Sequence, residues 1–236
     1  MKWIRTKTYE ELSAVAADLI ADVVKGKPNA VLGLATGSSP IGTYDALTAR
    51  YERGELDFSA VRSVNLDEYI GLDGSHEQSY RYFMNKNFFD RVNIDKKNTY
   101  VPNGLAEDPD AHGEEYDANI VALGGIDLQL LGVGLDGHIG FNEPADHFVA
   151  PTHRETLDPS TIEANARFFA SKEDVPTSAI TMGMRSIMQA RKILIIGSGK
   201  KKIDVLERAF GGNVTPMLPA SILLLHPDVT IVTSEE

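Results

Sequence analysis

The strongest constraint in this sequence is a regular alternation of short apolar runs with longer amphipathic stretches along the whole chain. Short apolar runs bounded by Gly, Pro or Asp are typical of buried strands, and apolar residues spaced three and four apart are typical of helices. Strands that alternate with helices favour a doubly wound, Rossmann-like α/β fold, in which helices cover both faces of a mostly parallel sheet. We predict strands over 30–35, 61–66, 126–133, 192–196 and 229–232, and helices over 8–25, 41–53, 78–90, 110–123 and 177–190.

No Pro-, Gly- or Ser-rich linker interrupts this alternation, so we predict a single domain over residues 1–236. At roughly 150 residues per domain, that length fits one large domain. The first predicted helix also has a start signal, because Thr8 and Glu11 have the spacing of a capping box.

Charge and cysteine content narrow the classes of function. The formal net charge of -11 disfavours nucleic-acid binding, which relies on basic patches that neutralise phosphates. The chain has no cysteine, which excludes disulfides, thiolate catalysis and Cys-ligated metals, and a cytoplasmic location is expected. We expect neither a signal peptide nor contact with a membrane, since no apolar run approaches the roughly 20 residues of a membrane span.

Four unusual loops follow the carboxyl ends of predicted strands, at 36–40, 67–69, 134–144 and 197–200. Ligands of open α/β sheets bind in the crevice outside these strand ends. Four polar or Gly-rich loops on one edge of the sheet therefore predict a single composite site.

The loop 36–40 reads Thr-Gly-Ser-Ser-Pro and joins a predicted strand to a predicted helix. Free N–H groups at a helix N-terminus bind anions, and hydroxyl groups add further donors. An ordinary cap and turn is the alternative interpretation. The loop is not a P-loop, because the Gly-Lys-Ser/Thr ending is absent. The candidate phosphate ligands are Thr36, Gly37, Ser38 and Ser39.

Residues 132–137 match the dinucleotide-binding pattern G-x-G-x-x-G, but we reject that interpretation. The fingerprint has to open a helix after the first strand. Here it lies in the middle of the chain, and 138–144 continue as His-Ile-Gly-Phe-Asn-Glu-Pro without a helical stripe.

The same loop instead brings together Asp136, His138 and Glu143. A histidine beside two carboxylates suits general acid–base catalysis, because a carboxylate can orient the ring and the ordinary pKa of about 6.5 lies near neutral pH. A metal site and a solvated loop are the alternatives. We expect no metal, because no HExxH pair or other clustered ligand spacing is present.

Three further charged residues are candidates on weaker grounds. Asp67 follows an apolar strand in Asn-Leu-Asp-Glu-Tyr and is a candidate base, with a helix cap or surface turn as the alternative. Arg167 and Lys200 are candidate phosphate ligands, with ordinary surface charge as the alternative. Lys201 and Lys202 follow directly, so spacing alone does not identify which lysine binds.

In order along the chain, these segments resemble the glucosamine-6-phosphate deaminase family. The resemblance extends over nearly the whole chain, and 134–144, Gly-Leu-Asp-Gly-His-Ile-Gly-Phe-Asn-Glu-Pro, is its most specific part. The segments 35–40, 65–69, 165–169, 197–200 and 219–221 support it.

The resemblance implies conversion of glucosamine 6-phosphate to fructose 6-phosphate and ammonia, without cofactor or metal. His138, supported by Asp136 and Glu143, would open the sugar ring, and Asp67 would take the proton from C2. Two proton transfers at different carbons need two separately placed groups, which the two carboxylate loops supply. The phosphate would be held by Thr36, Gly37, Ser38, Ser39, Arg167 and Lys200.

Two other families are alternatives. The 6-phosphogluconolactonases look similar and share an Asp-Gly-His element, but they follow it with a Ser-Leu-Phe-Pro type sequence, whereas 139–144 supplies the extra carboxylate of Glu143. A sugar-phosphate-sensing domain of a transcription regulator needs no acid–base groups. It would also carry a DNA-binding helix-turn-helix, for which this acidic chain has no spare segment.

Some members of the resembled family are hexamers activated by N-acetylglucosamine 6-phosphate, bound at a phosphate site after the Asn-Glu-Pro segment. Here Asp146 and Glu155 occupy positions where a serine and a lysine are expected, and His153 replaces an expected arginine. Arg154 is the one basic residue of the segment that could still contact a phosphate. Carboxylates repel a phosphate. The chain also ends at Glu236 without the C-terminal extension of the allosteric members. We expect a monomer or small homo-oligomer without effector activation.

Overall fold

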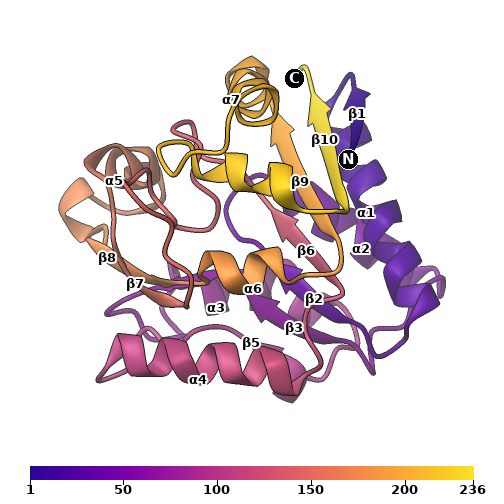
Figure 1. Cartoon of the computed structure of the whole chain (residues 1–236). Helices are drawn as coiled ribbons and strands as arrows, with labels where there is room; N and C mark the ends of the chain where they lie inside the picture. Colours follow the sequence, from indigo (N-terminus) through magenta and orange to yellow (C-terminus); the bar gives the residue numbers. More distant parts are fainter.

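The computed structural model describes residues 1–236 and contains a seven-stranded sheet flanked by helices (Figure 1). All neighbouring strands of this sheet run parallel. Its central strands β2 and β6 are buried along their whole length and, apart from Gln129, carry no polar side chain, as expected of strands covered on both faces. The order across the sheet is β1 (Lys2–Thr6), β10 (Val229–Ser234), β9 (Ile193–Ser198), β6 (Leu128–Leu131), β2 (Val31–Leu34), β3 (Arg62–Asn65) and β5 (Thr99–Tyr100).

The direction of winding assigns the helices to two layers. The chain moves outward from β2 through β3 to β5, and then crosses back through β6 and β9 to β10. Because such crossovers are right-handed, helices before and after this reversal lie on opposite faces. One face carries α1 (Tyr9–Gly26), α2 (Ile41–Glu52) and α3 (Tyr80–Asn87), and the other carries α4 (Pro109–Ala122), α6 (Met184–Met188) and α7 (Lys200–Gly211).

The reversal places β2 and β6 side by side in the middle of the sheet. Loops that leave the carboxyl ends of these two strands run to opposite faces and open a crevice between them. The doubly wound, single-domain α/β fold predicted from the sequence is confirmed.

A second, smaller sheet was not predicted. It has three antiparallel strands in the order β4 (Asp67–Tyr69), β8 (Ser178–Thr181) and β7 (His153–Thr156). The predicted helix over 177–190 is therefore wrong in its first part, and only 184–188 is helical. The four residues of β8 are fully buried between two partner strands, and this tertiary pairing overrides the local helical pattern.

Other boundaries agree within a few residues. The hydroxyl of Thr8 accepts the N–H of Glu11 as predicted, although the Glu11 carboxylate accepts the N–H of Lys7 rather than that of Thr8. The sequence prediction missed β1, β5, α7 and the segment formed by α5 (Pro159–Asn165) with the 3-10 turns η3 (Ala166–Phe168) and η4 (Lys172–Asp174). None of the helices combines the length and apolar character that crossing a membrane requires.

Candidate active site

A cavity of about 460 Å³ lies at the carboxyl ends of β2, β3 and β6, where the sequence predicts a composite site. The loops 36–39 and 132–138 form two of its sides, and Asp67, which follows β3, also lines it. The segment α5–η3 covers it from the side. Of the ten candidate site residues, eight line this cavity, together with neighbours from the same loops: Thr36, Gly37, Ser38, Ser39, Asp67, Asp136, His138 and Arg167.

Two glycines shape the loop that carries the histidine. Gly137 has a φ of +96°, a conformation that side chains rarely adopt, and a Cβ there would overlap the side chain of Leu218. A Cβ at Gly134 would overlap the ring of His138. The Gly-x-x-Gly-His spacing is thus what folds the imidazole back against its own loop, 21% exposed and facing the cavity.

His138 lies between two carboxylates, and both face the same ring nitrogen. Its Nδ1 lies 2.8 Å from Asp136 Oδ1 and 3.4 Å from Glu143 Oε2, and neither contact is aligned as a linear hydrogen bond. Burial lowers the pKa of the ring, but the contacts with Asp136 and Glu143 outweigh burial and raise the pKa to about 9. The imidazole therefore carries a proton at neutral pH. In return, the contact with His138 outweighs burial and holds the pKa of Asp136 well below its usual range.

The far end of the same loop is fixed by buried hydrogen bonds. The side-chain amide of Asn142 donates to the carbonyls of Ile139 and Met182, and Thr181 accepts the N–H of Phe141. Thr181 is also the strand partner of Asp67 in the small sheet. The pairing of β4 with β8 therefore sets the position of Asp67 relative to the histidine loop.

Asp67 is the second titrating group of the cavity, and it is 6% exposed. Burial, and then the charge of the neighbouring Glu68, raise the pKa of its carboxyl to about 8, although the charge on His138 opposes both effects. A carboxylate with such a pKa is a strong enough base to take a proton from carbon, since proton transfer is efficient when the pKa lies near the working pH.

Glu68 was not singled out from the sequence, yet it is only 1% exposed beside Asp67. Its carboxylate accepts the N–H groups of Tyr69, Tyr80 and Arg81 and the hydroxyl of Ser79, all at 2.9–3.0 Å. Four donors stabilise this buried charge without a cation. They also fix the start of α3, from which Tyr80 reaches the cavity.

Positive charge gathers at the opposite end of the cavity, beside the loop 36–39. Lys202 Nζ donates to Ser39 Oγ at 2.7 Å, and burial and then the charge of Arg167 lower the pKa of Lys202. Two cations near one another, facing hydroxyls and the open N-terminus of α2, form a site suited to a phosphate group. Arg167 also stacks on Phe168 at 4.6 Å.

Lys200, predicted as a phosphate ligand, lies elsewhere. It is the first residue of α7, its side chain is 85% exposed, and its Nζ pairs with Asp204 at 2.8 Å, outside the cavity. Lys202 lines the cavity instead, because it shares a helix face with the buried Leu206 and Ala209, four and seven positions later. Recognising the apolar spacing of α7 would have identified this lysine from the sequence.

Glu143, the remaining candidate, contacts His138 from behind the cavity rather than lining it. The cavity wall also includes two apolar side chains that sequence reasoning did not assign, Leu135 and Phe168, which are 55% and 40% exposed. Both side chains lie at the opening of the cavity rather than in the core.

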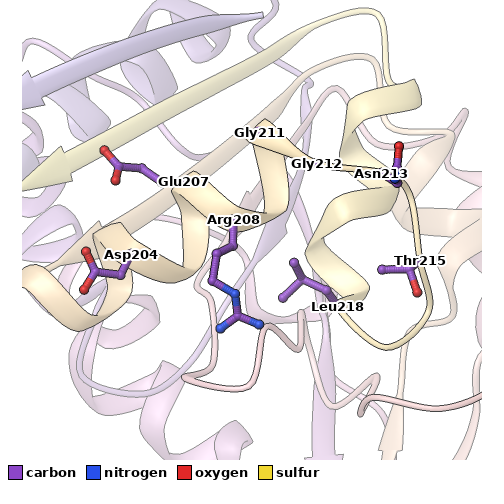
Figure 2. Close-up of a pocket in the computed structure, with 8 residues that line it drawn as sticks. All are labelled: Asp204, Glu207, Arg208, Gly211, Gly212, Asn213, Thr215 and Leu218. Atoms are coloured by element: carbon purple, nitrogen blue, oxygen red, sulfur yellow. The ribbon is translucent and has the colours of Figure 1, made fainter.

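A second hollow of about 640 Å³ lies between α7 and the turn before η5 (Pro219–Leu225), as Figure 2 shows. It is open and is lined mainly by polar and glycine residues, Leu218 being its single apolar side chain. It contains no histidine and none of the paired acid–base groups, so it is not the reaction site. Its link to that site is structural, since Leu218 packs against Gly137 of the histidine loop.

The side chains of Asp136, His138 and Glu143 offer three ligand atoms within 4.8 Å of one another. An imidazole nitrogen with two carboxylate oxygens is a donor set that a divalent cation accepts. The same nitrogen, however, is the one that the two carboxylates engage when the ring is protonated. A bound cation and the imidazolium therefore exclude one another.

The sequence model of the family described as glucosamine-6-phosphate isomerases and 6-phosphogluconolactonase matches residues 5–232. The chain belongs to this family. A glucosamine-6-phosphate deaminase of Lachnoclostridium phytofermentans is 58% identical over 232 residues, which cover 98% of each chain. A solved structure of a monomeric glucosamine-6-phosphate deaminase is 44% identical, covers 100% of this chain and 98% of its own, and superposes with a TM-score of 0.97.

The lactonase branch of the family is more distant. The 6-phosphogluconolactonase of Shewanella baltica is 17% identical, covers 99% of this chain and 97% of its own, and has a TM-score of 0.76. At that identity the likeness shows a shared fold and nothing about the reaction. The resemblance to the deaminases drawn from the sequence is confirmed.

Proposed function

We propose that this chain converts glucosamine 6-phosphate and water to fructose 6-phosphate and ammonia. The proposal rests on one observation: a single cavity contains a separate carboxylate base, a histidine group and a cationic end. Asp67 and the His138 group face it from different strands, and the cations beside the loop 36–39 form its third part. The deaminase names of relatives at 58% and 44% identity support the same reaction.

Each part has its own task in the proposed reaction. The protonated His138 gives its proton to the ring oxygen, and the neutral imidazole then takes up the proton of the C1 hydroxyl, so the C1–O bond to the ring breaks and an open aldehyde forms. Asp136 and Glu143 stabilise the imidazolium during this exchange. The phosphate is held by the loop 36–39 with Arg167 and Lys202.

Asp67 then removes the C2 proton from the open sugar, which leaves an enol-type intermediate bearing the amine on C2. The protonated Asp67 returns its proton to C1, which converts the intermediate to a C2 imine, and water hydrolyses the imine to the ketone with release of ammonia. The reaction needs no electron acceptor and no group transfer, so acid–base residues account for every step.

Ammonia and fructose 6-phosphate released by the purified protein from glucosamine 6-phosphate test this proposal directly. We expect both products in equal amounts, in buffer without added metal and with EDTA present. The measurement with EDTA distinguishes catalysis by the protonated His138 from catalysis by a cation bound to Asp136, His138 and Glu143, because EDTA would remove such a cation. Hydrolysis of a 6-phosphogluconate lactone without ammonia release would assign the chain to the lactonase reaction instead.

A pair of lysine variants tests the corrected phosphate site. We expect Lys202→Ala to raise KM about tenfold or more with kcat nearly unchanged, because binding shared by ground and transition states appears in KM. Lys200→Ala is the matched control, two residues away on the same helix and paired with Asp204, and its KM should equal that of the wild type. If only Lys200→Ala raised KM, Lys200 rather than Lys202 would be the residue that binds the phosphate.

We further propose that the enzyme is a cytoplasmic monomer or small oligomer without effector activation. Glu155 lies 3.2 Å from His153 Nε2, and Asp146 pairs with His147, so a carboxylate already lies beside each histidine of this segment. The monomeric relative at 44% identity is consistent with this. Light scattering should give no hexamer, and rates should be hyperbolic and unchanged by N-acetylglucosamine 6-phosphate. Sigmoidal rates that this compound makes hyperbolic would contradict the proposal.

A further inference from the structure

The loop 36–39 has a second neighbour on the side away from the cavity. Tyr9 is the first residue of α1, and its hydroxyl lies 3.0 Å from the carbonyl of Ser39 and 3.1 Å from that of Ser38. The same oxygen accepts the N–H of Gly42 at 2.8 Å. One phenol thus contacts both the back of the loop and the first turn of α2.

This contact replaces a cap that α2 lacks. The residue in the N-cap position is Pro40, which makes no side-chain hydrogen bond to the helix. First-turn N–H groups have no partner within their own helix and need one from outside. Tyr9 supplies it for Gly42 from a different helix, so α1 fixes the position of α2 at the cavity edge.

The contact also determines which way the loop presents its N–H groups. A trans peptide holds its carbonyl oxygen and its N–H on opposite sides of the chain. The Ser38 carbonyl points to Tyr9, so the N–H of Ser39 points the other way, toward the side on which Ser38 and Ser39 line the cavity. No protein atom accepts that N–H.

The packing is close enough to require glycine at position 42. A Cβ on Gly42 would lie 2.9 Å from Tyr9 Cε1 and would overlap the hydroxyl of Ser13, one turn further along α1. Gly42 is on an ordinary helix, where glycine is unfavourable. Its presence is explained by the close approach of Ser13 and Tyr9 of α1.

We propose that Tyr9 is a positioning residue for the phosphate subsite, which turns the Ser38–Ser39 peptide so that its N–H faces a bound phosphate. It touches no substrate itself and acts through the loop and the start of α2. The proposal rests on the proposed function only in that the loop 36–39 receives the phosphate group of the substrate.

Tyr9→Phe removes the hydroxyl and keeps the ring. We expect KM for glucosamine 6-phosphate to rise about three- to tenfold, the effect of losing one hydrogen bond, with kcat within about twofold of the wild type. The dissociation constant for inorganic phosphate, measured by calorimetry, should rise by a similar factor. Gly42→Ala places a Cβ against both Ser13 and the ring of Tyr9, which forces α1 and α2 apart at this contact, and it should shift both quantities in the same direction.

Tyr51→Phe is the matched control, since Tyr51 lies at the other end of α2, outside the cavity, and its hydroxyl makes no hydrogen bond. It should leave both constants unchanged. The phosphate measurement needs no turnover, so it tests Tyr9 even if ammonia release fails. Unchanged phosphate binding in Tyr9→Phe, or a loss of kcat without a change in KM, would overturn the proposal.

Discussion

Asp67→Asn is expected to lower kcat for ammonia release by about 10²- to 10⁴-fold, the usual effect of removing a general base. Asparagine has the same shape but cannot accept the C2 proton. The measurement is turnover with glucosamine 6-phosphate, together with exchange of the C2 proton with solvent. Asp73→Asn, a carboxylate on the exposed turn after β4, is the control and should keep full activity. Turnover by Asp67→Asn within a few-fold of the wild type would rule out Asp67 as the base.

The raised pKa of Asp67 gives this prediction a second readout. The folded value of about 8 lies above the ordinary value of 3.8, so the folded state binds this proton more tightly than the unfolded chain does. Stability supplied by the protonated carboxyl is present below about pH 4 and is lost as the pH rises through about 8. Above neutral pH the asparagine variant should therefore melt at a higher temperature than the wild type while being inactive.

The pKa of Asp67 also determines the acidic limb of the pH profile. Only the deprotonated carboxyl can act as a base, so kcat/KM should rise with pH through about 8. His138 must carry its proton to protonate the ring oxygen, so kcat/KM should fall above about 9. The maximum is expected between these two values.

The position of the site was predictable from the sequence because it follows from topology. Polar loops after β2, β3 and β6 have to meet at one edge of a parallel sheet, whatever their local conformation. The residue types on those loops then define the chemistry. The pairing of His138 with Asp136 was predictable for a different reason. The two residues are only two positions apart on a Gly-rich loop, so their side chains have few other arrangements.

What sequence reasoning missed depends on contacts between distant segments. The strand β8 forms because two distant strands pair with it. The strand β4 lies 110 or more residues earlier in the chain and β7 about 25 residues earlier, and a local sequence pattern does not reveal such partners. Glu68 was not singled out because three of its four donors come from the start of α3, 11 to 13 residues later. Lys200 was preferred over Lys202 because the start of α7 was not recognised, and the first turn of a helix decides which of two lysines faces inward.

His138→Gln should slow the reaction of the cyclic sugar by about 10²-fold or more, because glutamine keeps a polar side chain but cannot carry the proton to the ring oxygen. An open-chain analogue, which lacks the hydroxyls needed to close a ring, skips that step and should lose only a few-fold. The matched control is His147→Gln, an exposed histidine nine residues later that pairs with Asp146 outside the cavity.

The pH profile of His138→Gln separates a proton carrier from a merely structural histidine. The alkaline limb near pH 9 should disappear, because its titrating group is gone. The acidic limb should move to higher pH, because the positive charge that lowers the pKa of Asp67 is gone as well. Equal losses on the cyclic and open-chain compounds, with the alkaline limb intact, would show that ring opening depends on another group and that His138 only supports the loop.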